Sequence, residues 1–171
     1  GHAAGVLTNR PNSCPSGSHN SPEAEIGAHC VQLTDLPLMG SGLLTWFASV
    51  RRNLPDYTYL KPNPVHALSL LGLILGWETE TALARAASLA GGEADGAPWQ
   101  ALEDVHIVVL EDSTNGLKAS RTAQTCLTEA GVKVTLECIG VTTHPEKRAA
   151  LETVADRIVP DINAVRWNEL G

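Results

Sequence analysis

Hydrophobic and polar positions alternate in a regular way along the second half of the chain. Residues 106–110 form an apolar run typical of a buried strand, and residues 113–130 carry small or apolar side chains at helical spacing. A β-rich run over 132–141, a helical segment over 146–154 and a short apolar run over 157–160 follow. Strands that alternate with helices in this way predict an α/β fold with a parallel sheet.

The predicted helix over 113–130 carries a stripe of small side chains that would let it lie close to a sheet. The stripe has 4-3-4-3 spacing and consists of Gly116, Ser120, Ala123, Leu127 and Ala130. Gly131 stands where a helix commonly ends in a left-handed residue.

The first half of the chain is less regular. Residues 3–8 predict a short strand that ends at Thr8, and the Pro-, Ser- and Asn-rich residues 9–27 predict a flexible loop. Beyond this loop the pattern predicts a strand over 28–34, a helix over 43–53, an extended segment over 56–65, helices over 66–76 and 78–90, and a variable surface loop over 91–104. The length of 171 residues predicts one domain over 1–171.

The net charge, the longest apolar stretch and the cysteines indicate which kinds of partner and cellular environment to expect for this protein. The net charge of −7 argues against nucleic acid or an anionic membrane surface as the main partner. The apolar stretch 68–77 is too short to span a membrane. The four cysteines show no paired spacing, so reduced thiols in an intracellular, cytoplasmic protein are expected.

Polar side chains follow two of the predicted strands at the point where each strand ends. Glu111 and Asp112 come directly after the apolar run, and Thr8 ends the first strand. Two adjacent carboxylates repel each other, so a cation is expected beside them. Because ligands bind at the carboxyl ends of parallel strands, both places are candidate site positions.

Each candidate also has an ordinary structural interpretation. Lys61, in the segment LKPNPV, could be a surface lysine in a turn, and Thr8 could be a turn or capping residue. Glu111 and Asp112 could be acids that complement the dipole of the following helix. The functional interpretation depends on the ordered set of all these residues.

In this order the motifs resemble those of the haloacid dehalogenase (HAD)-like hydrolase superfamily, in its phosphatase and phosphoglucomutase-like branch. VVLEDSTNGLKASRTA resembles the fourth motif of that branch, KPNP resembles its third motif, and VLTNRP resembles its second. The resemblance covers residues 57–163 well and is weak over 9–56. It implies a Rossmann-like three-layer α/β/α core with a parallel sheet.

The resemblance also implies roles for individual residues. Glu111 and Asp112 would hold Mg²⁺, a hard cation that prefers carboxylate oxygens. Lys61 would be a catalytic residue that neutralises a phosphoryl oxygen and the nucleophile, and Thr8 would donate a hydrogen bond to the phosphoryl group. The remaining implied site residues are Asn9 on the substrate, with Ser113, Asn115 and Gly116 in the fourth motif.

One element of the family pattern is missing from this chain. The first motif of the family is Asp-x-Asp, whose first Asp forms an aspartyl-phosphate, and this sequence contains no Asp-x-Asp. Asp35 is the only acid at the end of an early apolar run, and it follows Thr8 in the chain. The resemblance therefore predicts that an upstream segment or a second chain supplies the nucleophile.

The resulting hypothesis is a Mg²⁺-dependent phosphohydrolase that acts on a small phosphorylated metabolite and is inactive as this chain alone. The alternative is a non-catalytic HAD-like binding or scaffold subunit. Neither hypothesis involves nucleic acid or a membrane as a partner.

Overall fold

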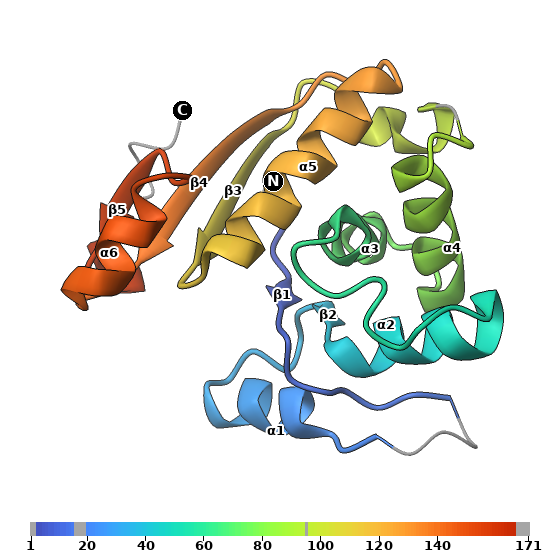
Figure 1. Cartoon of the computed structure of the whole chain (residues 1–171), viewed down its shortest axis with the longest axis horizontal. Coiled ribbons are helices and arrows are strands. Elements are labelled where there is room, and N and C mark those ends of the chain that lie inside the picture. Colours follow the sequence, from blue (N-terminus) through green and yellow to red (C-terminus); the bar gives the residue numbers. More distant parts are fainter. Residues whose placement is uncertain (1–2, 16–19, 95, 167–171) are drawn as a thin grey trace.

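The computed structural model describes residues 3–15, 20–94 and 96–166. In this part of the chain five strands form two parallel sheets, and helices pack against both (Figure 1). The fold is therefore α/β, as the alternation of strands and helices predicts. The strands are β1 (Val6–Leu7), β2 (Leu38–Met39), β3 (His106–Glu111), β4 (Thr135–Val141) and β5 (Arg157–Val159). The α-helices are α1 (Glu23–Cys30), α2 (Ser41–Trp46), α3 (Pro64–Ile74), α4 (Thr79–Ala90), α5 (Thr114–Glu129) and α6 (Pro145–Leu151).

The larger sheet has the order β3-β4-β5, with all strands parallel. Residues His106 to Glu111 pair in register with Thr135 to Gly140, and α5 provides the crossover between β3 and β4. The sequence prediction of these strands and helices is confirmed, with bounds that differ by a few residues.

The smaller sheet contains only β1 and β2, which are also parallel. The expected single sheet is thus divided into two, because β1 pairs with β2 and no pairing joins β1 to β3 among the described residues. Helix α3 packs on both strands of the smaller sheet, and it also packs against α5, which lies on β3 and β4. A shared helical layer therefore holds the two sheets side by side (Figure 1).

Local sequence signals fix both ends of α5. The hydroxyl oxygen of Ser113 caps the helix by accepting from the amide of Gly116 at 3.2 Å. Just beyond the helix Gly131 adopts φ +81°, the left-handed conformation that a glycine adopts without a steric penalty. The small-residue stripe faces inward, as expected, with Gly116, Ser120, Ala123 and Leu127 buried.

Helix α3 is the central helix of the main hydrophobic core. Its first turn is set by Asn63, whose side chain accepts from the amide of Val65 at 2.9 Å, and by Pro64 at the first helical position. The helix is buried on most sides, because it lies between the smaller sheet, α4 and α5. The nearly all-apolar sequence of this segment predicts such a buried helix.

Several expectations for the irregular parts of the chain are wrong. The strand expected over 28–34 is absent, because residues 28–30 end α1 and the residues after it form turns. The loop expected over 9–27 is shorter, since α1 begins at Glu23; residues 16–19 lie outside the described part. The extended segment expected over 56–65 is also absent, because residues 56–63 form turns and bends and Pro64 begins α3.

The surface loop expected over 91–104 contributes to the core. It contains a 3₁₀ helix, Ala97–Leu102, in which Trp99 is fully buried. The rings of Trp99 and Trp77 form an edge-to-face pair with a centroid distance of 4.6 Å. This segment therefore closes one end of the main core.

Over the described ranges, no helix is both long enough and apolar enough to cross a membrane.

Candidate functional site

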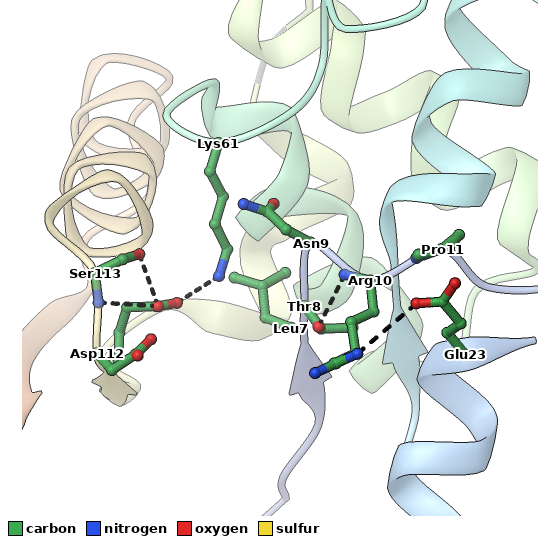
Figure 2. Close-up of a pocket in the computed structure, with 10 residues that line it drawn as sticks. Leu7, Thr8, Asn9, Arg10, Pro11, Glu23, Lys61, Asp112 and Ser113 are labelled. Carbon is green, nitrogen blue, oxygen red and sulfur yellow. Dashed lines mark hydrogen bonds and ion pairs between the residues drawn. The ribbon is translucent and has the colours of Figure 1, made fainter.

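An open pocket of about 490 Å³ lies where β1 and β3 end (Figure 2). Residues far apart in the sequence meet here because the packing of α3 against α5 holds the two sheets side by side, and β1 and β3 both end at this pocket. The lining residues are Leu7, Thr8, Asn9, Arg10, Pro11, Glu23, Lys61, Glu111, Asp112 and Ser113. The structure therefore brings together six of the eight residues that the sequence singles out for a site.

Lys61 and Glu111 form the most buried polar contact of this pocket. The ammonium group of Lys61 donates to Oε2 of Glu111, and the two side chains are only 4 % and 11 % exposed. The other oxygen, Oε1, accepts from the hydroxyl of Ser113 at 2.8 Å and from its amide at 3.2 Å. Both carboxylate oxygens of Glu111 are thus engaged.

Asp112 lies at the open side of the pocket. Its Oδ2 accepts from the ammonium of Lys147 at 2.9 Å, and both side chains are more than half exposed. The hydrogen bond from Lys147 is the main cause that lowers the pKa of the Asp112 carboxyl, so this group is ionised at neutral pH. Asp112 is the carboxylate of the Glu111-Asp112 pair that solvent and ligands can reach.

The opposite wall of the pocket comes from the segment after β1. The hydroxyl oxygen of Thr8 accepts from the amide of Arg10 at 3.1 Å, which fixes a tight bend as the strand ends. The guanidinium of Arg10 lies 3.8 Å from the carboxylate of Glu23 in α1. This wall presents a hydroxyl, the amide side chain of Asn9 and a cation to the pocket.

The remaining candidates of the fourth motif lie outside the pocket lining. Gly116 is buried directly against Glu111, since a Cβ at this position would lie 2.1 Å from Oε2 of the carboxylate. Asn115 is exposed in the first turn of α5. Asp35, the acid that ends an early apolar run in the sequence, lies in an exposed turn and does not line the pocket.

Sequence reasoning missed four lining residues. Leu7, Arg10 and Pro11 directly flank Thr8 and Asn9, so their position next to the second motif is a usable signal. Glu23 has no such signal, because it reaches the pocket only through the packing of α1.

A buried histidine lies close to this site. His66, in the first turn of α3, is fully buried, and its Nε2 lies 3.3 Å from the carbonyl oxygen of Met39. Burial, followed by the nearby charge of Lys61, lowers the pKa of His66 to about 4. The imidazole is therefore neutral at physiological pH and adds no positive charge beside Lys61.

The residues fit a magnesium ion only in part. In the described part of the chain, no group of three or more His, Cys, Asp or Glu side chains is arranged to hold a metal. Asp112 is accessible and ionised, whereas both oxygens of Glu111 are engaged by Lys61 and Ser113. Mg²⁺ usually takes one or two carboxylates and completes its shell with water and phosphate oxygens, so Asp112 fits as one ligand.

Comparison with known proteins adds no family assignment. No family model matches the chain, and no curated protein and no solved structure matches it significantly. What this pocket does must therefore be argued from its own chemistry.

Proposed function

We propose that this chain is the core of a Mg²⁺-dependent, HAD-like phosphohydrolase that cleaves phosphate monoesters of a small metabolite. The observation that carries the proposal is the convergence of Thr8, Lys61 and Glu111-Asp112 on one pocket. These residues come from three separate motifs, and a pocket at the carboxyl ends of parallel strands is where an α/β fold binds phosphorylated ligands.

The chain's own residues would bind and polarise the phosphoryl group. Lys61 would place a shielded ammonium on a phosphoryl oxygen, and Glu111 with Ser113 would hold that ammonium in position. Thr8 and Asn9 would donate hydrogen bonds from the opposite wall. Asp112 would hold Mg²⁺, which supplies charge neutralisation at the phosphoryl oxygens when bound.

The nucleophile in this proposal is an aspartate outside this chain. Its carboxylate oxygen would bond to phosphorus while the ester P–O bond breaks, and the departing alkoxide would take a proton from solvent water. Water would then attack phosphorus, releasing inorganic phosphate and restoring the carboxylate. All three pocket carboxylates of this chain, those of Glu23, Glu111 and Asp112, are paired with cations, which agrees with a nucleophile from elsewhere.

That same pairing favours a second candidate function. With each pocket carboxylate paired, the chain could serve as a non-catalytic HAD-like binding subunit for an anionic ligand. The two functions differ in their need for Mg²⁺ and in product release.

The test combines metal binding with turnover. Millimolar Mg²⁺ is expected to raise the melting temperature, and Asp112→Ala is expected to abolish that increase. Glu80→Ala is the matched control, because it breaks a comparable exposed ion pair with Arg51 away from the pocket. A panel of phosphorylated metabolites, assayed on the product of the full reading frame, should show Mg²⁺-dependent phosphate release. Binding of phosphate esters without release would favour the second candidate.

A further inference from the structure

Arg10 has a fixed main chain in the segment that follows β1. Its amide donates to the hydroxyl oxygen of Thr8 at 3.1 Å, and its carbonyl oxygen accepts from the amide of Ser41 at 3.0 Å. Pro11 follows directly, and its carbonyl oxygen accepts from the amide of Ala24 at 2.9 Å. A residue before proline is also restricted in its backbone conformation. The Cα atom of Arg10 is therefore held in place beside the pocket.

The side chain of Arg10 is held much less firmly. It is 70 % exposed, and within the described part of the chain its one polar partner is the carboxylate of Glu23, 3.8 Å away. This distance exceeds that of a hydrogen bond, so Glu23 does not use the N–H donors of the guanidinium. Glu23 is itself half exposed and accepts from the hydroxyl of Ser21 at 3.0 Å. An exposed ion pair of this kind contributes little to stability, so a ligand can take the place of Glu23 at low cost.

The pocket contains two cationic side chains in different environments. Lys61 is 4 % exposed and pairs with Glu111, whereas Arg10 is exposed on the opposite wall (Figure 2). The volume of about 490 Å³ exceeds the need of one phosphoryl group, because pockets of roughly 300–1,000 Å³ bind whole small molecules. The rest of such a ligand would meet a mostly polar wall, since only Leu7 and Pro11 among the lining residues are apolar.

We propose that Arg10 binds a second anionic group of the substrate, a carboxylate or a phosphate, so that the pocket selects small phosphate monoesters with two anionic groups. The inference rests on the proposed function, because it takes the phosphoryl group at Lys61 as the first anionic group. A planar guanidinium matches carboxylate and phosphate oxygens alike through two parallel N–H···O bonds. A neutral group at the same place leaves the guanidinium with Glu23 and gains neither bond.

Three probes that differ only in the group facing Arg10 test this selection. Glycerol phosphate has a neutral hydroxymethyl group there, phosphoglycerate has a carboxylate, and glycerol bisphosphate has a second phosphate. Calorimetric titration of the 171-residue chain at constant free Mg²⁺ measures the three dissociation constants. We expect a probe with two anionic groups to bind about tenfold more tightly than glycerol phosphate. Whichever of the two charged probes binds more tightly identifies the second group as carboxylate or phosphate.

Three variants show whether Arg10 causes the preference. Arg10→Met keeps the length of an exposed side chain, so it should fold, and it should abolish the preference because the cation and its donors are removed. Arg51→Met is the matched control, because it removes the same charge from an exposed ion pair with Glu80 away from the pocket; it should keep the preference. Glu23→Gln removes the carboxylate that competes for the guanidinium and should increase the preference about two- to threefold.

The possible outcomes separate this inference from the proposed function. Equal affinities for the three probes would overturn the role of Arg10, as would a preference that persists in Arg10→Met, disappears in Arg51→Met or decreases in Glu23→Gln. If Mg²⁺ still strengthened the binding of all probes in that case, the proposed function would stand. A preference that needs Arg10, together with affinities that do not respond to Mg²⁺, would overturn the proposed function alone. No binding of any probe would overturn both.

Discussion

The ammonium group of Lys61 and the carboxylate of Glu111 form an ion pair between positions 50 residues apart in the chain. The two side chains are 4 % and 11 % exposed, so water screens this pair very little. The pair connects the segment before α3 to the end of β3, where both residues line the pocket.

Removing one member of this pair should be costly. In Lys61→Met the carboxylate of Glu111 stays shielded from water but has lost the cation that pairs with it. We therefore expect the free energy of unfolding to fall by about 3–5 kcal/mol. The double variant Lys61→Met/Glu111→Gln should recover most of that loss, because it removes the unpaired charge. Urea denaturation of the variants measures both values.

The exposed pair between Lys147 and Asp112 is the internal control for this prediction. Its side chains are 53 % and 63 % exposed, so Lys147→Met should cost less than about 1 kcal/mol. A loss for Lys61→Met no greater than that for Lys147→Met would show that the Lys61 pair is not shielded in solution.

Gly116 should not tolerate a side chain. A Cβ there would lie 2.1 Å from Oε2 of Glu111, and that carboxylate cannot move without losing its contacts to Lys61 and Ser113. We expect Gly116→Ala to lower the free energy of unfolding by about 1–3 kcal/mol, although alanine favours a helix. Thermal and urea unfolding both report this change.

Gly27 provides the matched substitution in another helix. It lies in α1, and a Cβ there would meet no atom within 4 Å. Gly27→Ala should therefore stabilise the protein by about 0.5–1 kcal/mol. If both alanine variants were stabilised equally, the close contact between Gly116 and Glu111 would be refuted.

Local patterns explain why the second half of the chain could be predicted from its sequence. Strand β3 is an unbroken apolar run, and α5 has both a serine cap at Ser113 and a glycine stop at Gly131. The rule that ligands bind at the carboxyl ends of parallel strands predicted site positions at Thr8 and Glu111. The place of Lys61 beside them was predicted only by the resemblance of KPNP to the third HAD motif.

The parts that could not be predicted have different physical causes. Strands β1 and β2 have two residues each, which is too few to show a periodic pattern. The local sequence therefore does not indicate that the sheet is divided into two. The segment 28–34 carries Val31 and Leu33, which favour a strand, but Gln32 adopts φ 60° in a turn after α1. Both apolar side chains are exposed, and local backbone hydrogen bonds hold the turn, because the amides of Gln32 and Leu33 donate to carbonyl oxygens in the last turn of α1.

The segment 91–104 is expected to contribute strongly to stability. Trp99 is fully buried against Trp77 and fills one end of the main core. We expect Trp99→Ala to lower the free energy of unfolding by about 3–5 kcal/mol, because it leaves a large cavity. The neighbouring Gln100 is exposed, so Gln100→Ala should change stability by less than about 0.5 kcal/mol. Equal effects of the two variants on the free energy of unfolding would show that this segment is a surface loop and that Trp99 does not contribute to the core.

The buried imidazole of His66 should make the fold sensitive to mild acid. Its pKa is lowered to about 4 in the folded protein, from an ordinary value of 6.5, by burial and by the charge of Lys61. Between these two values the unfolded chain binds a proton that the folded protein does not, so stability falls as the pH decreases from 6.5 toward 4. The full loss corresponds to about 3 kcal/mol.

Urea unfolding at several pH values between 7.5 and 4 measures this dependence. His66→Gln removes the titrating group and should flatten the curve in this range, even though the variant itself is less stable at pH 7. His29→Gln is the matched control, since His29 is exposed at the end of α1, and it should keep the slope of the parent chain. If His66→Gln kept the full slope while His29→Gln lost it, the acid sensitivity would arise at the surface, and the buried neutral imidazole beside Lys61 would be excluded.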